Sequence, residues 1–399
     1  MLPVKRPCRL GEGYRLLKEL LRFASRLELM SLKVESSLCV KVRWRRAECD
    51  RCFAGCPAQG IRVGQTVQVE SCVLCGVCTV QCPTGVFTLQ ENSDGGILLR
   101  AQKLAARWGS LVFSCDRSPR SIAVRPDRVA VRCAARVSPE LLVAALSLGA
   151  QVAYLYLDRA ACAHCWGERM EQAAKVASQK AQAILDACGS NHKVVLTRSL
   201  PPPVSCRGNG VRTAEGGVDE GKRALLKAVK GMSSAKTLLK AVLDVSDHEK
   251  AFTWTQSLPQ RRRILLEALA RLSPAGTPDP EATLPWAGLK LAGGCTFCGA
   301  CVPLCPSGAL KVEERNGEAW LWFYPARCTS CGLCLTCCPE GALSYGPKPE
   351  LKYFLNGEGQ LLGRATARRC AVCGRTYLCT DSGQTYCPTC RIHKLTRTR

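Results

Sequence analysis

The stretch from Cys295 to Pro306 reads Cys-Thr-Phe-Cys-Gly-Ala-Cys-Val-Pro-Leu-Cys-Pro, with spacings of two, two and three residues between its cysteines. The same pattern returns at 328–339 and at 72–83. A fourth copy, at 46–57, has Arg46 where the first cysteine would stand. The copies form two pairs on either side of a long segment without the pattern, which predicts two copies of one structural unit.

The chain has 29 cysteines in 399 residues. The apolar run Leu16 to Phe23 is interrupted by charged residues, so it does not resemble an export signal. No apolar run approaches the roughly 18 residues that a bilayer-spanning helix needs. Cysteines in such a chain are typical of metal-bound thiolates in a reducing compartment, and we expect a cytoplasmic protein.

The spacing has a chemical reason. Three thiolates in one tight loop can bind three irons of a [4Fe–4S] cluster, and the fourth cysteine, carried away by the proline turn, binds the neighbouring cluster. The complete C-terminal pair therefore predicts one cluster on Cys295, Cys298, Cys301 and Cys338, and another on Cys328, Cys331, Cys334 and Cys305. This region resembles the bacterial two-cluster ferredoxin family, which implies a ferredoxin module at 286–348. Cys337 has no predicted ligand role.

The N-terminal pair, at 39–92, predicts a second ferredoxin module with one incomplete motif. Arginine cannot bind iron, so we expect Cys39 to replace the missing ligand by returning across a strand-like run at 40–44. The alternative is a three-thiolate or labile cluster, with Cys39 merely buried. The predicted sets are Cys39, Cys49, Cys52 and Cys82 for one cluster, and Cys56, Cys72, Cys75 and Cys78 for the other.

Residues 97–200 predict a central α/β domain with a parallel sheet. Short apolar runs predict strands at 111–114, 129–132, 152–157 and 194–196, and helices are expected at 139–148, capped by Ser138, and at 167–187. Four cysteines follow three of these strands: Cys115, Cys133, Cys162 and Cys165. Because parallel strands end at one edge of a sheet, the four thiols could converge on a [2Fe–2S] cluster or a structural metal. The alternative is a domain used only for docking.

The segment 131–140, together with the Cys162/Cys165 pair, looks like the small iron–sulfur delta subunit of methyl-viologen-reducing hydrogenase. That resemblance implies a [2Fe–2S] cluster and a link between hydrogenase and heterodisulfide reductase. The chain departs from the family at Cys115, where a cysteine pair is usual, and at Asp158, near another family cysteine.

The C-terminal tail, 362–399, carries two cysteine knuckles that predict a zinc ribbon. Its predicted zinc ligands are Cys370, Cys373, Cys387 and Cys390. A rubredoxin-like iron site is the alternative. Basic residues around the knuckles would suit nucleic acid, which we expect to be an unlikely partner beside so many predicted clusters.

The net charge suggests the kind of partner, and the remaining parts of the chain are predicted to form three further segments. The formal net charge is +24, and four clusters and one zinc, each −2 with their thiolates, would bring it to about +14. This favours redox partners with acidic docking surfaces. We expect a basic helical segment at 1–38, a linker at 201–221 and a helical connector at 222–285.

Together these patterns predict an α+β multidomain protein that relays single electrons between redox partners. The expected setting is an anaerobic hydrogenase, heterodisulfide-reductase-like or dehydrogenase complex. The sequence holds no G-x-G-x-x-G and no phosphate-binding G-x4-G-K-[ST] motif, so an electron-transfer subunit is favoured over a stand-alone enzyme. The alternatives are an oxidoreductase with its own cysteine site in the central domain, and a nucleic-acid-binding iron–sulfur protein.

Overall fold

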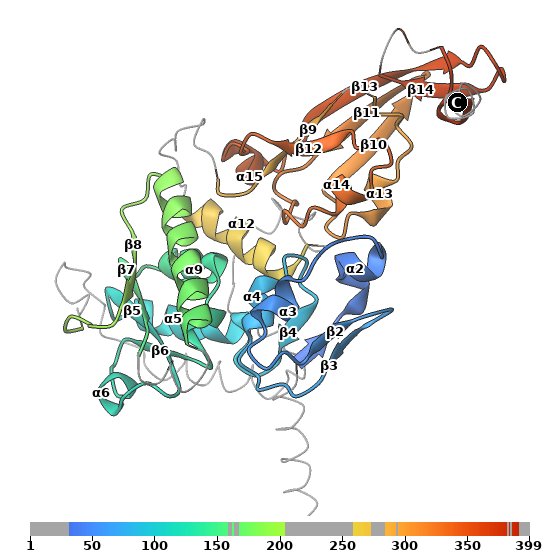
Figure 1. The fold of residues 1–399 in the computed structure, drawn as a ribbon. Helices are drawn as coiled ribbons and strands as arrows, with labels where there is room; N and C mark the ends of the chain where they lie inside the picture. Colours follow the sequence, from blue (N-terminus) through green and yellow to red (C-terminus); the bar gives the residue numbers. More distant parts are fainter. Residues whose placement is uncertain are drawn as a thin grey trace, which may run out of the picture.

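The computed structural model describes residues 32–158, 162, 167–203, 258–272, 284–292, 294–380, 383 and 385–390. In Figure 1 the N-terminal elements, in blue, lie beside both the central sheet and helices, in green, and the C-terminal strands, in orange. Most of the predicted connector, of the linker and of the basic N-terminal segment lies outside these residues. Within the described ranges, no helix has the length and apolar character needed to cross a bilayer.

Residues 32–89 form one unit, here called the N-terminal cysteine module. Strand β1 pairs antiparallel with β4, and β2 with β3. Its elements are β1 (Leu32–Val34), η1 (Ser36–Leu38), α2 (Val40–Arg43), α3 (Arg51–Gly55), β2 (Ile61–Val63), β3 (Val67–Val69), α4 (Val77–Gln81) and β4 (Phe87–Leu89).

The strand expected at 40–44 is wrong, because these residues form the short helix α2. Val40 is 3 % exposed and packs in a cluster with Ala47 and Leu333. This long-range packing outweighs the strand preference of the two valines in the run.

Residues 288–346, the C-terminal cysteine module, repeat the same plan. Strand β9 pairs antiparallel with β12, and β10 with β11. The elements are β9 (Gly288–Leu291), α13 (Cys301–Leu304), β10 (Leu310–Arg315), β11 (Glu318–Phe323), α14 (Leu333–Cys337) and β12 (Leu343–Gly346). The order of strand, helix, hairpin, helix and strand matches the N-terminal module, which has η1 and α2 in addition between its first strand and α3.

The central part is a four-stranded parallel sheet in the order β6-β5-β7-β8, flanked by helices. Its elements are α5 (Asp94–Ala105), β5 (Ser110–Cys115), α6 (Arg120–Ala123), β6 (Arg128–Val131), η2 (Ala134–Arg136), α7 (Pro139–Leu146), β7 (Val152–Tyr156), α9 (Glu168–Ala187) and β8 (Lys193–Thr197). The predicted parallel sheet and its helices are confirmed. Ser138 Oγ caps α7 by accepting a hydrogen bond from the Leu141 amide at 3.2 Å.

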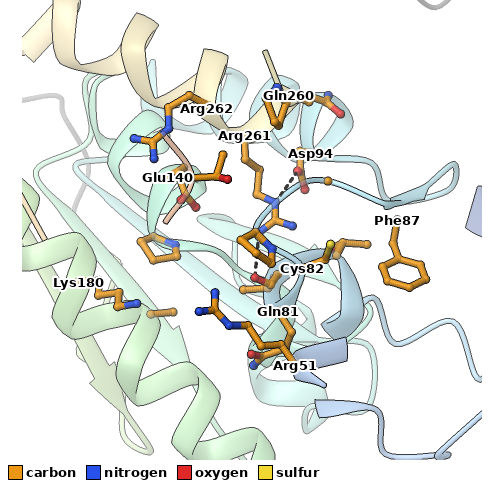
Figure 2. A pocket seen from close by; sticks show the side chains of 18 of the residues that line it. Arg51, Gln81, Cys82, Phe87, Asp94, Glu140, Lys180, Gln260, Arg261 and Arg262 are labelled. Carbon is orange, nitrogen blue, oxygen red and sulfur yellow. Dashed lines mark hydrogen bonds and ion pairs between the residues drawn. The ribbon is translucent and has the colours of Figure 1, made fainter. Parts of the chain in front are cut away.

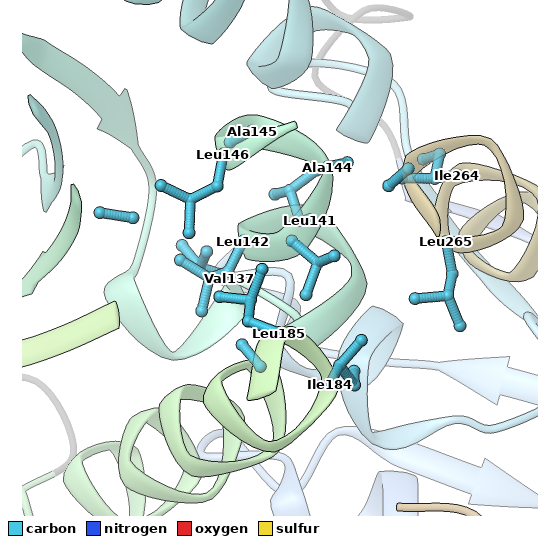
Figure 3. Packing of buried hydrophobic residues seen from close by; sticks show 14 of the residues in the cluster. Val137, Leu141, Leu142, Ala144, Ala145, Leu146, Ile184, Leu185, Ile264 and Leu265 are labelled. Carbon is cyan, nitrogen blue, oxygen red and sulfur yellow. The ribbon is translucent and has the colours of Figure 1, made fainter. Parts of the chain in front are cut away.

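Helix α12 (Gln260–Leu272) belongs to the core of this central part. Figure 3 shows its Ile264 and Leu265 facing Leu141 and Ala144 of α7. The same core takes in Phe354 of α15 (Lys352–Asn356). The central sheet, α12 and the segment after the C-terminal module therefore share one hydrophobic core.

The tail continues a sheet that begins in the C-terminal module. Strand β13 (Gln360–Arg369) pairs antiparallel with β11, and β14 (Thr376–Cys379) pairs with β13. The resulting sheet has the order β10-β11-β13-β14. The cysteine-rich end of the tail is thus attached to the module through backbone hydrogen bonds.

Candidate metal centres

The fourth cysteine of each motif stands at the end of a short helix. Cys56, Cys82, Cys305 and Cys338 are the C-caps of α3, α4, α13 and α14, and all four have an extended backbone. Each precedes a proline, which restricts the residue before it to this conformation. The chain therefore leaves the helix at the cysteine and carries its thiol away from the preceding loop.

The three complete motifs share an unusual loop backbone. The second residue after the first cysteine is left-handed in each, with φ of 55° at Leu74, 50° at Phe297 and 53° at Ser330. This turn aims amides at sulfur: the Leu74 and Ser330 amides donate to Cys72 Sγ and Cys328 Sγ, both at 3.4 Å. Hydrogen bonds of this kind stabilise thiolates that bind iron.

A left-handed glycine follows the second cysteine of each complete motif, with φ of 78° at Gly76, 74° at Gly299 and 79° at Gly332. In the incomplete motif Asp50 occupies this position with φ of −118°. The incomplete loop therefore follows a different path as well as lacking a cysteine.

The fifteen motif cysteines and Cys39 fall into four groups of four, which we call quartets. Three quartets each line one hollow, and the members of the fourth interact electrostatically with one another. The hollows are lined by Cys39, Cys49, Cys52 and Cys82; by Cys56, Cys72, Cys75 and Cys78; and by Cys295, Cys298, Cys301 and Cys338. The fourth quartet is Cys305, Cys328, Cys331 and Cys334. Each quartet takes its outlying cysteine as the spacing predicts, and Cys39 lies where a replacement for Arg46 would.

Several buried thiols in these quartets have raised pKa values and are costly to ionise without a cation. Burial, followed by the charges of Cys82, Cys39 and Cys49, raises the pKa of Cys52 to about 11. Burial raises the pKa of Cys301 to about 12 and that of Cys331 to about 11, again with neighbouring thiolates adding to the effect. A bound metal reverses this balance because its charge stabilises the thiolate form.

The two cysteine modules touch at a buried cluster that includes one cysteine from each of two quartets at its edge. Val40, Ala47 and Leu333 form a buried cluster, and Cys49 and Cys331 pack against it. Arg43 Nη1 also donates to the Pro303 carbonyl at 3.1 Å. This junction joins the Cys39 quartet to the Cys305 quartet.

A second junction joins the N-terminal module to the central part. Val77, Ala135 and Met170 form its buried cluster, with Cys75 and Cys133 packed against it. Burial raises the pKa of Cys133 to about 12, and its thiol interacts with those of Cys75, Cys115 and Cys162. Three of the four cysteines predicted at the sheet edge thus lie near one another. The fourth, Cys165, lies outside the described residues.

The tail cysteines make the tightest group. The sulfurs of Cys370, Cys373, Cys387 and Cys390 all lie within 4.8 Å of one another. The Cys387 amide donates to Cys370 Sγ at 3.3 Å. Hydrogen bonds from the Cys387 and Cys373 amides lower the pKa of Cys370 to about 6. Four sulfurs in this arrangement suit a tetrahedral metal ion.

Two arginines near the quartets were missed by the sequence reasoning. Arg136 is 2 % exposed and Arg262 is 5 % exposed, and both line a cavity next to Cys82. A signal was present for Arg262, which stands on the apolar face of its helix in register with Leu265 and Leu269. A cation in such a stripe indicates a buried charge rather than a solvated surface.

Replacing Gly76 with alanine is expected to destabilise the protein. The added Cβ would lie 2.7 Å from Arg136 Cδ, and the left-handed backbone would cost about 1–2 kcal/mol more. The measurement is the melting temperature of the iron-loaded full chain. Gly64→Ala is the matched control, because no atom lies within 4 Å of the new Cβ. Equal melting temperatures for the two variants would contradict this account.

Comparison with known proteins identifies one region. Residues 294–342 match the 4Fe–4S dicluster domain family, and no curated protein matches the chain. The match spans both complete motifs of the C-terminal module, from Cys295 to Cys338. The chain therefore contains an iron–sulfur domain of the two-cluster type at its C-terminal module.

Proposed function

We propose that the protein is an electron carrier with four [4Fe–4S] clusters, one on each quartet, that relays single electrons between redox partners. The observation that carries the proposal is the junction at Val40, Ala47 and Leu333, where Cys49 and Cys331 pack against the same cluster. Two ferredoxin-type modules that worked independently would not need contact between their cluster sites. A relay needs neighbouring cluster sites, because the rate of electron transfer between clusters falls steeply with distance.

Contacts along the molecule support one linear order of sites. Within each module the two quartets are linked by their outlying cysteines, as the spacing predicts. The order runs from the Cys295 quartet to the Cys305 quartet, then across the junction to the Cys39 quartet and on to the Cys56 quartet. Beyond it, Cys75 and Cys133 pack against the same buried hydrophobic cluster, so a metal site in the central part would be next in the order.

The central cysteines support a fifth metal site better than a thiol-based catalyst. A nucleophilic or redox-active cysteine works as a thiolate and so needs a low pKa. The pKa of Cys133 is instead raised to about 12 by burial, so a metal-free thiol there would be protonated at neutral pH. A bound [2Fe–2S] cluster would supply the charge that stabilises the thiolate, which favours electron transfer over an independent oxidoreductase.

The four tail cysteines fit a structural zinc ion. In this proposal the zinc ribbon stabilises the C-terminal module at the end of the relay. Thr380 Oγ1 donates to the Cys295 carbonyl at 3.4 Å, which ties the tail to the outermost quartet. The basic charge of the chain suits acidic partner surfaces. The partners that fit best are a hydrogenase, a heterodisulfide-reductase-like enzyme or a dehydrogenase.

Metal analysis tests the cofactor count. Anaerobically reconstituted full chain should contain about 16 Fe and 16 sulfide, or about 18 Fe with a central [2Fe–2S] cluster, and about one zinc. Electron paramagnetic resonance of the dithionite-reduced protein should show interacting [4Fe–4S]+ signals. A reproducible value near 8 Fe would mean that only one module carries clusters.

The role of Cys39 can be tested by Cys39→Ser. If Cys39 replaces the ligand missing at Arg46, the variant should lose up to about 4 Fe or convert one cluster to a [3Fe–4S] form with its own resonance signal. Cys188→Ser is the control, since Cys188 is equally buried but lies in the central core. Unchanged iron and an unchanged spectrum in Cys39→Ser would show that Cys39 is not a ligand.

The central site can be tested by Cys133→Ser. The variant should lose about 2 Fe and the optical bands of a [2Fe–2S] cluster, while the [4Fe–4S] signals persist. Cys337→Ser is the control, because the Cys337 thiol is buried and donates to the Cys334 carbonyl. If both variants keep the same iron content as the parent chain, the central part holds no cluster.

A further inference from the structure

A cavity of about 560 Å³ lies where the two cysteine modules, the central part and α12 meet. Figure 2 shows Arg51, Lys180 and Arg261 directed toward this space from α3, α9 and α12. Asp94 and Glu140 are the carboxylates in its wall. None of the predicted cluster sites accounts for the cavity, although Cys82 forms part of its lining.

The cavity wall carries more positive than negative charge. Its cations are Arg51, Arg136, Lys180, Arg261 and Arg262, against the two carboxylates. This leaves an excess of three positive charges around a space that is partly open to solvent, where Arg51 and Lys180 are exposed. The clusters proposed on the Cys39 and Cys305 quartets, behind Cys82 and beside Thr329 and Ser330, would offset this excess from outside the cavity, but they would offer no acceptor to the side chains that line it.

Two buried arginines in the cavity wall have N–H groups without a hydrogen-bond partner in the described residues, and Arg136 is the first. Its Nη2 forms an ion pair with Asp94 at 3.0 Å. Its Nε and Nη1 have no hydrogen-bond partner among the residues that the structure describes. The side chain lies against Gly76, where an added Cβ would come within 2.7 Å of its Cδ.

Arg262 is the second. Its Nη2 donates to the Cys328 carbonyl, and its guanidinium lies 4.4 Å from the centre of the Trp286 ring. Its Nη1 finds no acceptor in the described ranges. A guanidinium stays charged in a protein, so an unpaired N–H in this position is costly unless something accepts from it.

The two guanidinium groups indicate which kind of ligand would suit this cavity. Planar guanidinium groups match the oxygens of phosphate and carboxylate groups in paired hydrogen bonds. The volume lies within the range of about 300–1,000 Å³ that is usual for small-molecule sites.

We propose that this cavity binds a small anion carrying phosphate or carboxylate groups. Arg136 and Arg262 would have to turn their closed-off N–H groups outward to bind its oxygens from the buried end, and Lys180 would contribute from the more open side. The site would lie beside Cys82, at the meeting point of the two modules and the central part. The residues that line it are placed by protein contacts, whereas its net charge also depends on the two neighbouring clusters of the proposed function.

Calorimetric titration of the iron-loaded full chain tests the proposal, with pyrophosphate and citrate as the two probes. At least one probe should bind at about one per chain, and its identity separates the phosphate source from the carboxylate source. Arg136→Gln should weaken binding about tenfold, as loss of a charge-assisted pair does. Lys180→Gln should weaken it about threefold, because its partly solvated charge is screened.

Lys103→Gln is the matched control for Lys180→Gln, since Lys103 is exposed on α5 and does not line the cavity. It should bind the probe as the parent chain does. If Arg136→Gln fails to load iron, the comparison between Lys180→Gln and Lys103→Gln decides. Absence of binding by both probes at millimolar concentration would overturn the proposal, as would equal affinity in the Lys180 and Lys103 variants.

Discussion

The arrangement of the molecule depends on a local backbone constraint, the extended conformation that proline imposes on the cysteine before it. At Cys56, Cys82, Cys305 and Cys338 this constraint ends a short helix and sends the thiol toward the neighbouring quartet. Each module is thereby cross-connected, because neither of its quartets is complete without a residue from the other half. The hairpins and paired terminal strands of both modules enclose these connections.

Much of this could be predicted from sequence because it depends on short spacings. The grouping of the C-terminal quartets follows from two loops and two prolines, and the parallel sheet follows from apolar runs such as Val152 to Leu157. Cys39 was also expected beside Cys49 and Cys52, and the structure brings them together, but iron binding by this group remains a prediction. The predicted path between them was wrong, since the helix α2 and not a strand leads from Cys39 toward Cys49.

Features that depend on assembly could not be predicted. Val40 adopts a helical conformation because Leu333, far away in sequence, packs against it. Arg136 lies in the short helix η2, where no charge pattern in the sequence indicates a buried site. The cavity beside it forms where α4, α7 and α12 come together. The junction between Cys75 and Cys133 likewise requires the central part to dock on the N-terminal module.

The pairing of β13 with β11 has a consequence for the solubility of shortened chains. Strand β11 carries Trp320, Leu321 and Trp322, and β13 saturates the backbone groups along one of its sides. Without the tail, that side would be an open strand edge with large apolar residues, which is a template for association between molecules. The tail therefore acts as a protective cover, ending in β14, a strand of only four residues that offers little surface for further pairing.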